Sequence, residues 1–118
     1  PPMVMVSHVL VPAWDAERSA SLSPRVIRDW LRGELGFNGL ILADDFSMGA
    51  VSSAKSAGEA SVEALIAGVD MVMTWPFNFT AVHRAILSSL RNGELSRERL
   101  REAAERIIYE KIRSGLIK

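Results

Sequence analysis

Two adjacent carboxylates, Asp44 and Asp45, directly follow a short apolar run at residues 39–43. A run of this length, bounded by a glycine and by charge, is typical of a parallel strand that is buried on both faces. Acidic residues just beyond the carboxyl end of such a strand lie where α/β proteins place their chemistry. Consecutive side chains on an extended chain point to opposite faces, so at most one of these carboxylates faces a site. The alternative is structural, because aspartate is also a common turn and N-cap residue.

Length and composition restrict the classes of protein to which the chain belongs. Its 118 residues, 48% of them hydrophobic, are enough for one domain with a buried core. Fourteen basic and fourteen acidic residues cancel, which argues against nucleic acid or an anionic membrane as partner and favours a neutral ligand such as a carbohydrate. The chain has no cysteine, so thiolate metal sites and disulfides are excluded. The apolar runs are too short to span a bilayer, no cofactor or metal is expected, and the compartment stays open.

The chain shows three repeats of a strand followed by a helix. Apolar runs predict strands at residues 3–6, 39–43 and 69–73, with a loop at residues 7–22. Capping residues and helical spacing predict helices that start at Ser23, end near Gly68, span about 79–91 and start after Ser96. Alternating arginine and glutamate residues predict a solvated face on the last helix.

This alternation requires right-handed crossovers and a parallel sheet, so the predicted fold class is α/β. A sheet of three parallel strands leaves two edges with unpaired backbone groups. Three such units match part of a (β/α)8 barrel, which takes about 250 residues. We therefore expect residues 1–118 to be a single, incomplete piece of one domain.

Several segments in a fixed order carry a family resemblance. They include Val-Ser-His-Val at residues 6–9, Ser-Leu-Ser-Pro at 21–24, Gly-Phe-Asn-Gly at 36–39, Ala-Asp-Asp-Phe-Ser-Met-Gly-Ala at 43–50 and Ala-Gly-Val-Asp-Met at 67–71. Together they resemble the carboxyl-terminal part of the catalytic barrel of glycoside hydrolase family 3, in its β-N-acetylhexosaminidase branch. The resemblance implies that residues 1–118 are the last three β/α units of a TIM-type (β/α)8 barrel.

The resemblance also implies a retaining glycosidase that removes β-linked N-acetylglucosamine from peptidoglycan-type glycans or chitooligosaccharides, with Asp44 as nucleophile. A retaining mechanism needs an ionised carboxylate beneath the anomeric carbon. Ala43 stands where the family usually has a hydroxyl residue, and Phe46 where it often has leucine. The family's acid/base resembles a histidine supported by an aspartate on an earlier loop, which this sequence does not contain. The chain alone is therefore expected to hydrolyse little.

Three further side chains are predicted to contact substrate. His8 follows the first strand, at the rim where Asp44 is expected, and either orients a substrate hydroxyl or bonds the rim backbone, with proton transfer as the alternative. Met48 follows the doublet and either lines the pocket or fills a gap. Trp75 follows the third strand and either stacks on a sugar face or plugs the loop. Asp70 opens the third strand at the face opposite this rim, where we expect a structural bond.

Two classes of function remain open. The first is a carbohydrate hydrolase whose active form includes the preceding barrel units. The second is a non-catalytic barrel remnant that binds glycans or a partner chain. The expected partners are a carbohydrate substrate and either the missing amino-terminal barrel segment or a second copy of the chain, with no nucleic acid and no membrane span.

Overall fold

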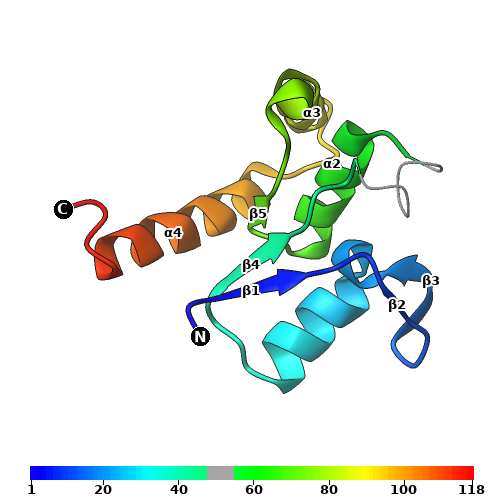
Figure 1. Cartoon of the computed structure of the whole chain (residues 1–118), viewed down its shortest axis with the longest axis horizontal. Helices are drawn as coiled ribbons and strands as arrows, with labels where there is room; N and C mark the ends of the chain where they lie inside the picture. The colour runs from blue at the N-terminus through cyan, green and yellow to red at the C-terminus, as the bar shows by residue number, and fades with distance from the viewer. Residues whose placement is uncertain (48–54) are drawn as a thin grey trace.

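A parallel three-stranded sheet lies at the centre of the computed structural model, which describes residues 1–47 and 55–118 (Figure 1). Its strands are β1 (Met3–Val6), β4 (Leu40–Ala43) and β5 (Met71–Val72), in the spatial order β1-β4-β5. The three predicted strands are therefore confirmed, although the third is shorter than residues 69–73. The fold is α/β, as the alternation of strands and helices predicted.

The strands are in register, and their carboxyl ends meet at one edge of the sheet. Val6 of β1 pairs with Ala43 of β4, and Ala43 pairs with Val72 of β5. The ladder continues one step further, because the Asp44 N–H donates to the Val6 carbonyl oxygen at 3.3 Å. We call this edge, defined by Val6, Ala43 and Val72, the carboxyl rim.

The segment after β1 differs from the prediction of a plain loop at residues 7–22. It contains a two-stranded antiparallel sheet of β2 (Leu10–Val11) and β3 (Asp15–Ser19), followed by the short 3-10 helix η1 (Ala20–Leu22). The expectation is wrong because β2 has only two residues and β3 reads Asp-Ala-Glu-Arg-Ser, which lacks alternating apolar residues.

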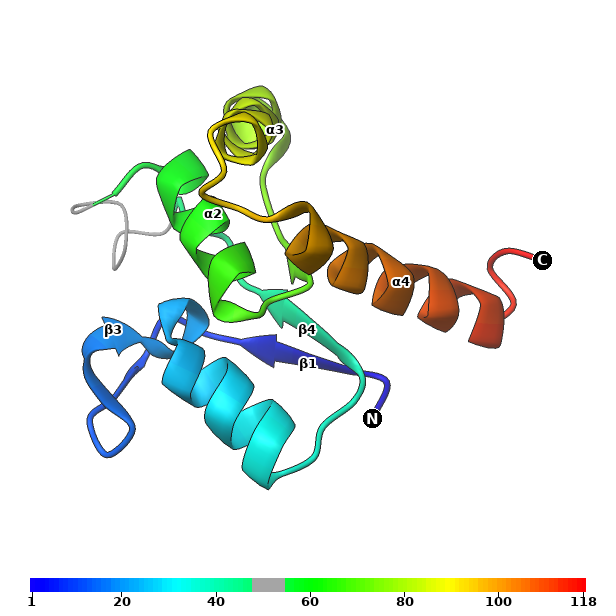
Figure 2. The same cartoon turned by 180° about the vertical axis from the view of Figure 1, so that it is seen from behind.

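Two helices cover one face of the sheet. They are η2 (Arg25–Glu34), the cyan helix drawn below β1 in Figure 2, and α2 (Ala57–Ala67), the green helix beside β4. The core between these layers is built from buried side chains that include Val6, Ile27, Ile41, Ala43 and Ala64. Gly68 ends α2 with φ of 122°, and a Cβ there would lie 2.9 Å from the Ile27 side chain, so glycine permits the close approach of the two helices.

The remaining helices are α3 (Pro76–Arg91) and α4 (Arg97–Arg113). The prediction of a start near residue 79 was late, because Pro76 occupies the first turn, where a missing N–H costs nothing. The predicted cap of the last helix is confirmed, since the Ser96 hydroxyl accepts from the Arg99 N–H at 3.1 Å. In the described residues, no helix has the length and hydropathy needed to cross a membrane.

The other face of the sheet is largely bare. The register places Met3 and Met5 of β1 on this face with Leu42, and they are 41% and 51% exposed. Met73, just after β5, is 41% exposed. Helix α4 reaches only the amino-terminal end of the face, where a cavity of about 310 Å³ is lined mainly by apolar residues such as Met3, Leu40, Met71 and Ile107.

A buried ionic cluster lies at the amino-terminal end of the sheet, opposite the carboxyl rim. The Asp70 carboxylate accepts from the Ile41 N–H at 3.1 Å, from Arg99 and Arg106 at 3.0 Å each, and from Arg32. Burial lowers the pKa of the Arg32 guanidinium, and the Asp70 carboxylate opposes that shift. The predicted structural role of Asp70 is confirmed by these bonds.

Arg99 corrects the prediction that the charged residues of α4 form a solvated face. Its side chain is 8% exposed and donates to the backbone carbonyl oxygens of Leu65 and Val69 at 2.8 and 2.6 Å. These bonds tie α4 to the end of α2 and the start of β5.

Replacing Asp70 with asparagine should lower the free energy of unfolding by about 3–5 kcal/mol, because three guanidinium groups lose their shared buried anion. The matched control is Glu102→Gln, which removes a 53% exposed partner of Arg99 and Arg106 and should cost less than about 1 kcal/mol. Urea unfolding of the protein that carries this chain measures both. Equal losses in the two variants would contradict the central role of Asp70.

Candidate active site

The two adjacent carboxylates at the carboxyl rim have different surroundings. Asp45 is 3% exposed, and its oxygens accept the Ser47 N–H at 3.1 Å and the Ser47 hydroxyl. Asp44 is half-buried, and its Oδ1 accepts the Asp45 N–H at 2.8 Å. Within the described residues, no donor is bonded to Asp44 Oδ2. Asp45 is thus bonded within the loop through both of its oxygens.

Two stacked rings pack the loop after β4 against the segment after β1. Phe46 is 1% exposed, and its ring stacks on His8 with a centroid distance of 4.6 Å. His8 Nε2 lies 2.9 Å from the backbone carbonyl oxygen of Asp45. His8 therefore bonds the rim backbone, one of the two contacts that its sequence position suggested.

The second ring nitrogen of His8 also has a protein partner. His8 Nδ1 lies 2.8 Å from the Ser21 hydroxyl, which belongs to η1 and is fully buried. The Ser19 hydroxyl lies 3.2 Å from the same Ser21 oxygen. Sequence reasoning assigned Ser21 no role. The sequence signal that could have indicated such a role is the alternation of serines at positions 19, 21 and 23, in the connection between the first two predicted strands.

Asp15 holds the segment that presents Ser21. Its carboxylate accepts the Ser23 hydroxyl at 2.7 Å and the N–H groups of Glu17 and Arg18 at 3.0 Å each. The Ser23 hydroxyl, followed by the two backbone donors, lowers the pKa of Asp15. Asp15 is therefore ionised at neutral pH and ties the start of β3 to Ser23, the residue that follows η1.

Trp75 lies just beyond β5, at the same end of the strands as the carboxyl rim. It is the N-cap residue of α3 and is 58% exposed. Met48, the remaining predicted contact residue, lies outside the described residues. The structure thus brings His8 against the loop that bears Asp44 and places Trp75 after the neighbouring strand, while substrate contact by any of them stays a prediction.

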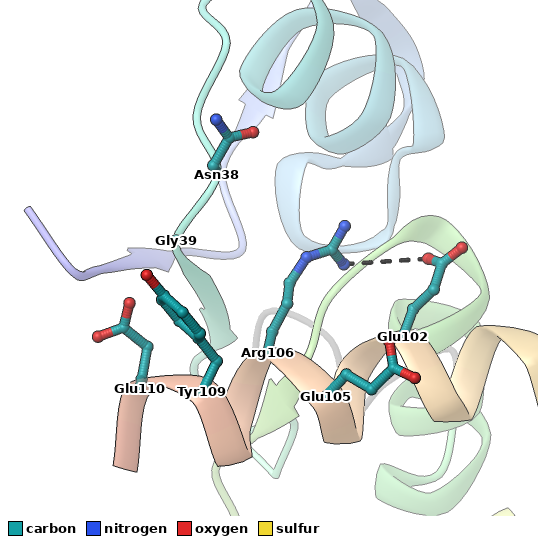
Figure 3. Close-up of a pocket in the computed structure, with 7 residues that line it drawn as sticks. All are labelled: Asn38, Gly39, Glu102, Glu105, Arg106, Tyr109 and Glu110. Atoms are coloured by element: carbon teal, nitrogen blue, oxygen red, sulfur yellow. Dashed lines mark ion pairs between the residues drawn. The ribbon is translucent and has the colours of Figure 1, made fainter. Parts of the chain in front are cut away.

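The cavity drawn in Figure 3 is not at this rim. It measures about 320 Å³ and lies at Gly39, directly before β4, against Arg106, Tyr109 and Glu110 of α4. Because Gly39 and Asp44 are at opposite ends of β4, this cavity is near the Asp70 cluster and remote from the carboxylate doublet.

The rim geometry suits a nucleophile or an electrostatic stabiliser. A half-buried carboxylate with one bonded oxygen is held in a fixed orientation, while its other oxygen remains available. The two histidines do not provide an obvious proton donor beside it. His8 has both ring nitrogens bonded within the protein, and the His83 ring stacks on Phe79 of α3 at 5.8 Å.

Known proteins are similar to this chain in sequence and in fold. The chain matches the Glycosyl hydrolase family 3 N terminal domain over residues 2–109. It is 30% identical to a β-N-acetylglucosaminidase/β-glucosidase of Cellulomonas fimi, over 96% of this chain and 22% of that protein. A β-hexosaminidase of Stenotrophomonas maltophilia is 44% identical over 70 residues, which are 59% of this chain and 21% of that protein. The chain spans less than a third of the length of the curated relatives it matches.

A solved structure agrees with these relatives. A glycoside hydrolase family 3 β-N-acetylglucosaminidase from a Paenibacillus species superposes with a TM-score of 0.91 at 34% identity, covering 97% of this chain and 22% of that one. The family resemblance drawn from the sequence segments is thereby confirmed. With a match that extends over nearly all of its residues and the same arrangement of strands and helices, the chain belongs to glycosyl hydrolase family 3, through that family's N-terminal domain.

Proposed function

We propose that this chain supplies the nucleophile, Asp44, of a retaining β-N-acetylhexosaminidase. The observation that carries the proposal is the contrast between two neighbouring carboxylates. Asp45 is buried, with both oxygens bonded to Ser47, whereas Asp44 is half-buried with Oδ1 bonded. A nucleophile needs an oxygen that can reach the substrate, and Asp44 is the carboxylate of the doublet that meets this requirement.

In the proposed reaction, a carboxylate oxygen of Asp44 attacks the anomeric carbon as the bond to the leaving oxygen breaks. A general acid gives that oxygen a proton. Water then attacks the glycosyl ester, its proton passes to the same acid/base group, and Asp44 departs as a carboxylate. Two displacements at one carbon retain its configuration. The Asp45 N–H bonded to Asp44 Oδ1 orients the carboxylate throughout.

The acid/base group is proposed to come from barrel units that precede this chain. Both ring nitrogens of His8 are engaged by Ser21 and Asp45, so proton transfer by His8 would first have to break one of these bonds. His83 lies on α3, stacked on Phe79. The family resemblance likewise assigns the role to a histidine on an earlier loop. Hydrolysis by this chain alone should therefore be slight.

The proposed substrate is a glycan with β-linked N-acetylglucosamine, of the peptidoglycan or chitooligosaccharide type. The support is the names of the relatives, β-N-acetylglucosaminidase and β-hexosaminidase. The absence of net charge on the chain suits a neutral sugar. Trp75 offers an exposed flat ring for the CH face of a pyranose, while His8 and Met48 are proposed to line the pocket.

The three β/α units are proposed to be the last three of a (β/α)8 barrel. The bare face of the sheet, which carries Met3, Met5 and Met73, would then be barrel interior and be covered by the remaining strands. Strands β1 and β5 are the edges of the described sheet, and barrel closure would pair them both.

The variant Asp44→Ala in the protein that carries this chain should lower kcat by roughly 10⁴-fold or more on an aryl N-acetylglucosaminide. Added azide should restore turnover and yield a glycosyl azide of inverted configuration, because the anion attacks from the side that the carboxylate vacated. NMR of the product reports its anomeric configuration. The control is Asp29→Ala, an exposed carboxylate on η2, which should leave kcat unchanged. A retained-configuration product or wild-type activity in Asp44→Ala would exclude Asp44 as nucleophile.

The variant Trp75→Ala should raise KM about tenfold with little change in kcat, a loss of about 1.4 kcal/mol in binding from lost stacking. Steady-state kinetics with a chitooligosaccharide measure the effect. Tyr109→Ala is the matched control, because Tyr109 is a 64% exposed aromatic on α4 near the opposite end of the sheet. An unchanged KM in Trp75→Ala would show that Trp75 does not contact the sugar.

The isolated 118-residue chain should not behave as a stable monomer of 13.0 kDa. Each large apolar side chain left in water forgoes about 1.5–3 kcal/mol, and several together approach the roughly 5–15 kcal/mol by which a domain is stable. Size-exclusion chromatography with light scattering should detect self-association. The double variant Met5→Lys/Met73→Lys should reduce it more than Leu35→Lys, an exposed apolar residue at the end of η2. A compact wild-type monomer that unfolds cooperatively would contradict the barrel proposal.

A further inference from the structure

We propose that Ser21 and His8 form a positioning link that fixes the loop bearing Asp44. This inference rests on the proposed function, since it assigns the link a role in nucleophilic attack. The link connects three separate segments, namely η1, the turn after β1 and the loop after β4. Neither residue touches the reacting atoms in this role, so both are positioning residues.

The partners of His8 determine where its proton lies. The Asp45 carbonyl oxygen can only accept, so His8 Nε2 carries the hydrogen of the 2.9 Å bond. In the neutral ring Nδ1 is then an acceptor, and the Ser21 hydroxyl donates to it at 2.8 Å. The Ser21 oxygen is left to accept from the Ser19 hydroxyl at 3.2 Å. The bonds thus run in one direction, from Ser19 to the Asp45 carbonyl.

Because the link is buried, water cannot easily replace its hydrogen bonds. Ser21 is fully buried, Asp45 is 3% exposed, and the His8 ring lies on the buried ring of Phe46. Water has little access to replace the Ser21 hydroxyl, so its loss leaves Nδ1 without a donor. The ring is then no longer held to the tautomer and orientation that donate to the Asp45 carbonyl.

The link reaches Asp44 through a single residue. The Asp45 backbone presents its N–H to Asp44 Oδ1 at 2.8 Å and, on the other side of its Cα, its carbonyl oxygen to His8 at 2.9 Å. On the other side, the Asp44 N–H is bonded to Val6. The residue that orients the nucleophile is therefore anchored by His8, and a shift of its backbone displaces the carboxylate. Misplacement of a reacting group by about 1 Å can slow a reaction by about 100-fold.

The experiment compares Ser21→Ala with Ser61→Ala in the protein that carries this chain. Ser61 is an equally buried serine on α2, where its hydroxyl donates to the Ala57 carbonyl oxygen at 2.7 Å. With an aryl N-acetylglucosaminide, Ser21→Ala should lower kcat about 10- to 100-fold while KM stays within about twofold. Ser61→Ala should change neither. In addition, His8→Gln, whose amide can still donate to the Asp45 carbonyl, should retain more kcat than His8→Leu.

A second measurement does not depend on activity. Nitrogen-15 NMR of histidine-labelled protein, with His8 identified through His8→Gln, should show that the neutral His8 ring is protonated at Nε2 and unprotonated at Nδ1. Ser21→Ala should disturb this pattern. A neutral ring protonated at Nδ1 would overturn the link, and so would an unchanged kcat in Ser21→Ala of an active enzyme, although Asp44 would then remain the proposed nucleophile. An inactive wild-type protein would instead overturn the proposed function, and the positioning role with it.

Discussion

The in-register parallel pairing of β1 with β4 is the constraint on which the rest of the rim depends. Val6 pairs with Ala43, and His8 and Asp45 each lie two residues beyond that pair. The register therefore places the His8 ring beside the Asp45 carbonyl and brings the Asp44 N–H onto Val6. A slip of one residue would turn every side chain of β4 to the other face and exchange the surroundings of the two carboxylates.

The two ends of the sheet differ in how their carboxylates are bonded. At the amino-terminal end, Asp70 gathers Arg32, Arg99 and Arg106 and ties η2, β4 and α4 together. Every hydrogen-bonding position of this buried carboxylate is used by the protein. At the carboxyl rim, Asp44 is half-buried, and among the residues that the structure describes only its Oδ1 accepts a hydrogen bond. In α/β barrels the residues that stabilise the fold and the residues that carry out chemistry also lie at opposite ends of the strands.

The features that could be predicted from the sequence are those that local patterns of residues determine. Apolar runs indicated the three strands, Ser96 indicated a helix start, and pleat alternation indicated that the carboxylates of the doublet would separate. Contacts between distant segments could not be predicted in this way. The partners of His8 are 13 and 37 residues away, and Ser21 comes near it through the β2–β3 pairing and the Ala20 N–H bond to the Val9 carbonyl oxygen. The sequence pattern of Arg99 is likewise that of a surface charge, and its burial follows from the packing of α4 against the end of α2 and against β4.

The central claim is that Asp44, rather than its neighbour, becomes covalently bonded to the sugar. Its most direct test is to incubate the active protein that carries this chain with a fluorinated N-acetylglucosaminyl donor, whose glycosyl-enzyme intermediate hydrolyses slowly, and to map the modified peptide by tandem mass spectrometry. The account predicts a single sugar ester on Asp44, retained after digestion at low pH. A sugar on Asp45, or on a residue outside this chain, would contradict it.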